Sequence, residues 1–210
     1  MEPPKVAKKE APSDLKRYIL DTSRRILVEQ GYTSLSMRKI AAEIGYSATS
    51  IYLHFKNKDA LFHALIDEGM SLLLERQMEG AARNPDDAVQ RLRVLCRGYI
   101  DFGLEMPEYY EIMFLLRPKL SNRFSIEIFR RARRNLDLVR ATIETGVTEG
   151  MMDVGDVDSM THVIWAQLHG AISILLAMRL DIRVDRQEFI ENVIDQVVLS
   201  VTKSRLQPAN

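Results

Sequence analysis

Two short helical patterns meet at Gly45, and this junction limits the folds open to the chain more than any other feature. The first pattern runs from Met37 to Ile44 and places its apolar residues on one helix face. Ser36 can cap its start, because a serine hydroxyl can accept a free N–H of the first turn. Gly45 suits the left-handed position just past a helix end, where a Cβ would be strained. The chain is therefore expected to turn sharply here and to begin a second helix.

The second helix is predicted over residues 48 to about 54, with Ser47 as its cap. At about 100° per residue, one side is apolar and carries Ala48, Ile51 and Phe55. The other side is mostly small or polar and carries Thr49, Ser50, Leu53 and His54. Two short helices joined by a tight glycine turn form a helix-turn-helix, so the apolar side is expected to pack on the first helix.

The outer side of this second helix suits a DNA major groove, where base edges offer donors, acceptors and the thymine methyl. Base readout is predicted from Arg38, Thr49 and Ser50, and His54 is placed near the groove edge. The full set of predicted DNA-binding residues is Ser36, Arg38, Ser47, Ala48, Thr49, Ser50, Tyr52, His54 and Lys58.

Two residues of that set are predicted to meet phosphates. Tyr52 lies on the border between the two helix faces, so its ring can pack while its hydroxyl reaches the DNA backbone. Lys58 begins the next helix, where its charge and the free amides of the helix start can face a phosphate together. The alternative is a three-helix module in which Tyr52 and His54 merely pack.

These residues resemble the DNA-binding domain of the TetR family of transcriptional regulators. The resemblance rests on the run Leu35-Ser-Met-Arg-Lys-Ile-Ala, on Gly45-Tyr-Ser, on Ile51-Tyr52-Leu-His54-Phe55-Lys-Asn-Lys58, and on a preceding helix that ends in Glu29-Gln-Gly31-Tyr32. It covers residues 14–66. It implies a homodimeric regulator that binds an operator and responds to a small-molecule effector.

The chain has no net charge, but its basic and acidic residues are distributed unevenly along the sequence. Through Phe62 there are 11 basic against 7 acidic residues, and the remainder holds 18 against 22. A mildly basic head on an acidic body fits a protein that touches nucleic acid at one end. The single cysteine, Cys96, allows no internal disulfide, and no signal peptide opens the chain, so a cytoplasmic location is expected.

The whole chain has helical patterns and no alternating strand pattern of useful length. We predict an all-α fold of about nine helices, in which a long helix from Lys58 joins a three-helix DNA-binding module to a helical regulatory domain. Residues 1–12 are expected to be a disordered arm, 13–60 the helix-turn-helix domain, and 61–206 a ligand-binding and dimerisation domain. The run Asn84-Pro85-Asp86-Asp87 carries the cap, proline and acids of a further helix start.

The last two helices are predicted over residues 156 or 158 to about 180, and about 185 to 203. The first of these is apolar nearly all round, so it must be buried on several sides. Its two histidines and its glutamine favour a protein interface over a membrane span. An antiparallel helix pair that meets its two-fold copy forms a four-helix interface, and Ile174 and Val197 are expected at it or beside it.

Methionine and aromatic side chains gather in the second domain around residues 106–114 and 165–178. They suit a pocket for an apolar or aromatic effector, although such stripes more often form plain core. The family resemblance places the effector here, and the run Trp165-x-x-x-His169-Gly170 resembles a C-terminal domain of one branch of that family. The predicted ligand-binding residues are Tyr110, Met113, Trp165 and His169.

Catalytic and cofactor motifs are missing from the sequence, which has no Gly-x-Ser-x-Gly elbow, phosphate loop or dinucleotide fingerprint. His162 and His169 are two helical turns apart, about 10 Å by helical rise, so they cannot share a metal. We therefore expect no enzyme, no cofactor and no metal site. The predicted function is a transcriptional repressor that a small apolar or aromatic effector releases from a palindromic operator.

A rival hypothesis is a helical ligand-binding or scaffolding protein without specific DNA readout. Ala48 and Leu53 favour it slightly, because neither side chain can hydrogen-bond a base edge. The polar residues predicted to contact DNA argue against it.

Overall fold

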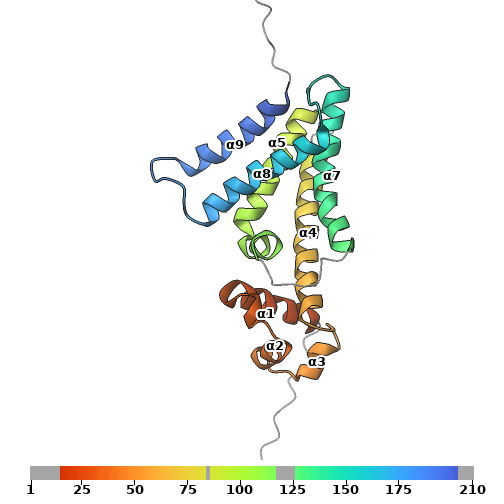
Figure 1. The fold of residues 1–210 in the computed structure, drawn as a ribbon, viewed down its shortest axis with the longest axis vertical. Coiled ribbons are helices and arrows are strands. Elements are labelled where there is room, and N and C mark those ends of the chain that lie inside the picture. Colours follow the sequence, from red (N-terminus) through yellow and green to blue (C-terminus); the bar gives the residue numbers. More distant parts are fainter. Residues whose placement is uncertain (1–14, 84–85, 117–125, 203–210) are drawn as a thin grey trace, which may run out of the picture. The chain divides into compact units, whose positions relative to one another are not determined.

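The computed structural model describes residues 15–83, 86–116 and 126–202. Within these ranges the chain forms nine α-helices and no strand, apart from one isolated β-bridge between Met152 and Thr202 (Figure 1). This confirms the all-helical prediction. The chain divides into two compact units, the first up to Leu65 and the second from Ile66. None of the helices in the described ranges combines the length and the apolar character needed to cross a membrane.

The first unit contains α1 (Leu15–Gln30), α2 (Met37–Ile44), α3 (Ala48–Tyr52) and the start of α4 (Lys58–Ala82). The bounds of α2 are those predicted, because its cap forms: Ser36 Oγ accepts the N–H of Lys39 at 3.2 Å. Gly45 ends the helix in the left-handed region, with φ of 74°. The core of the unit consists of Ile19, Ile26, Leu27, Ile40, Ile51, Phe55, Leu61 and Phe62.

The α3 helix ends at Tyr52, earlier than the predicted end near residue 54. The N–H of His54 bonds to the carbonyl of Ile51 at 3.0 Å, only three residues back, and this tighter turn closes the helix. Phe55 also donates its N–H to Ile51, at 3.0 Å, and its ring is 6% exposed. The early end of α3 therefore leaves Phe55 in the core, as predicted.

The second unit holds the rest of α4, then α5 (Ala88–Glu105), α6 (Pro107–Tyr110), a π-helical segment (Glu111–Leu115), α7 (Ile126–Thr148), α8 (Val157–Leu176) and α9 (Arg186–Val201). The α5 helix contacts α6, α7, α8 and α9, so it lies at the centre of this unit (Figure 1). Its buried side chains include Leu92, Leu95, Cys96, Tyr99, Ile100 and Phe102.

Two helix ends in this unit differ from the sequence prediction. The described α5 begins at Ala88, later than the predicted start, and Asp87 caps it, because its carboxylate accepts the N–H groups of Val89 and Gln90 at 2.9 Å. The α8 helix ends at Leu176 and not near residue 180. Met178 closes it with a left-handed φ of 53°, a conformation that usually needs glycine, so no residue type marks this end in the sequence.

Three sequence predictions fall outside the described residues. They are the arm of residues 1–12, the part of the helix start formed by Asn84 and Pro85, and the residues from 203 to 206 of the second domain.

Candidate DNA interface and ligand cavity

Two serine hydroxyls at the start of α3 are engaged in capping the helix, and the threonine between them is not. Ser47 Oγ accepts the N–H of Ser50 at 3.1 Å, and the two hydroxyl oxygens lie 2.9 Å apart. Both serine hydroxyls therefore take part in holding the first turn of the helix. Thr49, between them in sequence, is exposed, so its methyl and hydroxyl groups face solvent.

The outward side of α3 is open. Tyr52 is 53% exposed and Leu53 is 81% exposed, and His54 and Arg38 are exposed as well. The inward side is closed, because Ile51 is fully buried, while Ala48 is half-buried between the two. The helix thus has the two faces that the sequence predicts.

Lys58, at the start of α4, contacts Tyr32, which was not among the predicted DNA-binding residues. Its Nζ lies 4.4 Å from the centre of the Tyr32 ring, a cation–π contact. The Tyr32 hydroxyl donates to the carboxylate of Asp59, and its ring packs edge-on against Phe62 at 5.1 Å. Burial raises the pKa of Tyr32, which therefore stays a neutral donor. Asn57 caps the helix by accepting the N–H of Ala60 at 2.8 Å.

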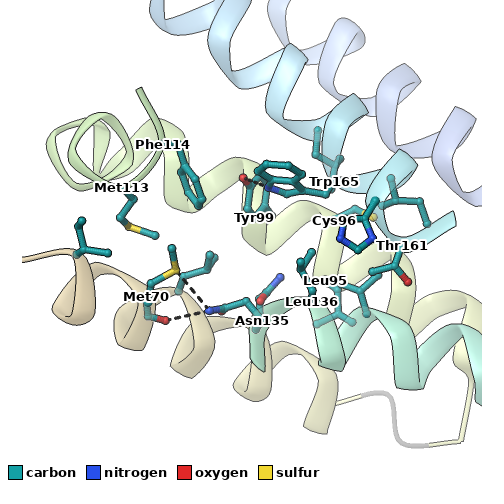
Figure 2. Close-up of a pocket in the computed structure, with 17 residues that line it drawn as sticks. Met70, Leu95, Cys96, Tyr99, Met113, Phe114, Asn135, Leu136, Thr161 and Trp165 are labelled. Atoms are coloured by element: carbon teal, nitrogen blue, oxygen red, sulfur yellow. Dashed lines mark hydrogen bonds between the residues drawn. The ribbon is translucent and has the colours of Figure 1, made fainter. Parts of the chain in front are cut away.

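A cavity of about 290 Å³ lies within the second unit, between α4, α5, the π-helical segment, α7 and α8 (Figure 2). This volume is at the small end of the roughly 300–1,000 Å³ of ligand pockets. Its wall is mainly apolar, with Met70, Leu73, Leu95, Met113, Phe114 and Trp165 among the lining side chains. No Lys, Arg, Asp or Glu is among its described lining residues.

Two of the four predicted ligand-binding residues, Met113 and Trp165, line this cavity (Figure 2). The indole Nε1 of Trp165 donates to the hydroxyl of Tyr99 at 2.9 Å, which fixes both rings in the wall. Burial raises the pKa of Tyr99 to about 12, so this phenol is neutral at ordinary pH.

The other two, Tyr110 and His169, do not line it. Tyr110 is fully buried, and its hydroxyl oxygen lies 2.5 Å from His169 Nδ1, with the rings stacked at 5.5 Å. Both rings pack against Phe114, which is in the cavity wall. Burial lowers the pKa of His169, so its imidazole favours the neutral form. This pair therefore packs against Phe114 on the side away from the cavity and supports the wall without lining it.

Sequence reasoning missed two polar side chains of the cavity wall, Gln77 on α4 and Asn135 on α7. Both are buried, with exposed fractions of 3% and 7%. The only signal in the sequence is that each amide falls on the apolar stripe of a long helix, where a buried polar group needs a partner.

The helices α8 and α9 run antiparallel to each other (Figure 1). A shallow, mainly apolar groove lies between them. It is lined by Ala166, Gly170 and Ile174 on α8 and by Phe189, Val193 and Gln196 on α9. Ile174 is 40% exposed, but Val197 is fully buried in the core of the unit. Val197 therefore does not lie on the exposed groove face itself, because its side chain is enclosed in the core of the unit, although the neighbouring Gln196 lines the groove.

Metal-binding groups do not assemble in the described part of the chain, where no three His, Cys, Asp or Glu side chains are placed to hold an ion. Cys96 lies in the cavity wall, and burial raises the pKa of its thiol to about 12, which keeps it protonated.

Two known protein families match successive parts of the chain. "Bacterial regulatory proteins, tetR family" matches residues 19–65, and "Tetracyclin repressor-like, C-terminal domain" matches residues 92–197. The chain is also 23% identical over 205 residues to the HTH-type transcriptional regulator AcrR of Shigella flexneri, which covers 92% of this chain and 94% of that protein.

Solved structures share the fold. A protein of unknown function from Rhodococcus sp. RHA1 has a TM-score of 0.80 at 21% identity, covering 93% of this chain and 100% of the other. The regulator FadR from Bacillus subtilis, in complex with stearoyl-CoA, has a TM-score of 0.71 at 20% identity, covering 87% and 97%.

Proposed function

This chain belongs to the TetR family of bacterial regulatory proteins, and we propose that it is a homodimeric repressor of transcription. Two copies of its helix-turn-helix bind a near-palindromic operator. A small apolar or aromatic effector enters the cavity of the second unit and weakens that binding. The protein then acts in the cytoplasm, beside the chromosome.

The two-faced α3 helix is the observation that supports DNA binding most directly. Its buried side fixes it to the core, and its other side presents Thr49 and Tyr52 to solvent. A helix-turn-helix uses such a face to enter the major groove. The test is a salt-titrated binding assay on genomic fragments. A steep salt slope with specific fragments recovered is expected, whereas the rival scaffolding protein would recover none.

Lys58 and Arg38 should separate backbone contacts from base readout. We expect Lys58→Ala to weaken binding on all sequences and to flatten the salt slope by about 0.9 for each lost phosphate contact, doubled in a dimer. We expect Arg38→Ala to relax one position in each half-site, since a two-bonded guanine contact gives roughly 1–3 kcal/mol of discrimination. Selection from random operators, repeated at several salt concentrations, measures both.

The two variants serve as controls for each other. If Lys58→Ala changed the preferred base at one position and kept the salt slope, Lys58 would not be a phosphate contact. If Arg38→Ala kept the full sequence preference, base readout would have to come from α3 alone.

The dimer is proposed to form through the α8–α9 groove face. Half-exposed apolar side chains on a surface helix mark such faces, and small residues such as Gly170 allow a second helix to approach closely. Ile174→Asp would leave a charge without a partner in that interface, so it should yield monomers in light scattering.

Val147 offers a matched control, because it is an apolar residue on α7 with a similar exposure, 36% against 40% for Ile174. Val147→Asp should leave the dimer intact. A dimer that survives Ile174→Asp would place the interface elsewhere. Val197→Asp cannot serve as this test, since its charge would lie in the core of one subunit.

A further inference from the structure

The two buried amides of the cavity each hold an oxygen that no group in the described part of the chain satisfies, Gln77 Oε1 and Asn135 Oδ1. The Asn135 amide nitrogen is occupied, because it donates to the carbonyl oxygen of Met70 at 3.3 Å and lies 3.8 Å from its sulfur (Figure 2). This contact fixes which end of the Asn135 amide carries the free acceptor. Buried acceptors without partners are uncommon in folded proteins, so these two need an explanation.

Other polar groups in the same wall are already bonded. The Thr161 hydroxyl donates to the carbonyl of Val157 at 2.8 Å, and the Tyr99 hydroxyl accepts from Trp165. The Nδ1–H of His162, another lining residue, donates to the carbonyl of Asp158 at 2.8 Å. The cavity therefore presents an apolar wall with two unsatisfied acceptor oxygens, and among these polar groups the amide nitrogen of Gln77 is the donor that remains. A ligand that fills it completes these bonds only if the ligand itself carries a donor.

From this arrangement we infer that the effector is an uncharged, mainly apolar molecule whose hydroxyl or amide N–H donates to Asn135 and Gln77. The inference rests on the proposed function only in taking this cavity as the effector site. A carboxylate would meet the free acceptor oxygen of Asn135 and no Lys or Arg among the described lining residues, so an anionic ligand is disfavoured. An ammonium would meet no carboxylate among the described lining residues, and burying it there is costly as well.

The test compares small probes of equal length on the full chain. 1-Octanol carries a donor, heptyl methyl ether has the same number of heavy atoms without a donor, and octanoate and octylammonium carry the two charges. Trp165 is the single tryptophan and lines the cavity, so its fluorescence reports occupancy. We expect 1-octanol to bind about tenfold more tightly than the ether, the factor of one hydrogen bond to a buried acceptor, and both ions to bind more weakly than 1-octanol.

Variants assign the preference to the two amides. The double variant Gln77→Met with Asn135→Leu replaces both acceptors by apolar side chains of similar size, so the alcohol and the ether should bind about equally. Thr161→Val is the matched control, because it removes a lining hydroxyl that is already bonded, and it should keep the tenfold preference. Gln77→Met alone should melt at or above the temperature of the unaltered protein, since it removes an unsatisfied acceptor from the core.

Equal affinity of the unaltered protein for the alcohol and the ether would mean that water satisfies the two oxygens, and would overturn the inference. Tighter binding of either ion, or no binding by any of the four probes, would overturn it too. The assay contains no DNA, so its outcome is separate from the proposed function. Failure to find an operator would contradict the proposed repressor function, and it would leave the affinities of the four probes unchanged.

Discussion

Replacing Phe55 by alanine is expected to unfold the DNA-binding unit. The ring is 6% exposed and closes the turn after α3, in a core shared with Ile51 and Phe62. Truncating a buried phenylalanine costs roughly 3–5 kcal/mol, through lost burial and the cavity left behind. The free energy of unfolding of a small domain is only about 5–15 kcal/mol, so this loss removes a large part of the stability of the unit.

Leu53→Ala is the matched control, because Leu53 lies two residues away and is 81% exposed. It should change the unfolding free energy by less than about 0.5 kcal/mol, as surface substitutions usually do. Urea unfolding followed by circular dichroism measures all helices, while the fluorescence of Trp165 follows the second unit alone. Phe55→Ala should shift the dichroism transition and spare the fluorescence transition. A Phe55→Ala protein as stable as the Leu53→Ala protein would refute the burial of this ring.

The first unit is predictable from its sequence almost residue by residue, because its short helices carry their own boundary signals. Ser36 and Ser47 form the caps that a serine before an apolar pattern predicts, and Gly45 adopts the left-handed turn. These are contacts between residues at most four apart. The contact of Lys58 with Tyr32 joins residues far apart in the chain, and periodicity does not give it.

In the second unit the sequence predicts the helices but not what each side chain meets. Tyr110 and His169 have the amphipathic character of pocket residues, yet they bond to each other behind Phe114, since each satisfies the polar atom of the other. Val197 belongs to an apolar stripe that faces the core, and the same stripe was compatible with an interface. Gln77 and Asn135 come together only because α4 and α7 border one cavity. Such pairings depend on helix packing, which no local signal specifies.

The second large effect expected is a 5- to 150-fold loss of operator affinity when the cavity is occupied. One continuous helix supports this coupling: α4 begins at Lys58 in the DNA-binding unit, and its later residues Met70, Leu73 and Gln77 line the cavity. A ligand in the cavity would press on these turns, and a packed helix passes such a push along as a rigid tilt because protein interiors compress poorly. Two recognition helices enter successive major grooves only when they lie about 34–36 Å apart, so a small tilt would misalign both.

Reciprocity makes this mechanism testable. If the ligand prefers the misaligned state, then operator DNA must weaken ligand binding by the same factor, and couplings of about 1–3 kcal/mol are usual. The affinity of a compound that occupies the cavity, followed by Trp165 fluorescence, should therefore fall 5- to 150-fold in saturating operator. Scrambled DNA at the same concentration is the control and should leave that affinity unchanged. If a compound fills the cavity with equal affinity in both titrations, its binding is not coupled to DNA binding, however tightly it binds. In that case α4 would not be the route of regulation.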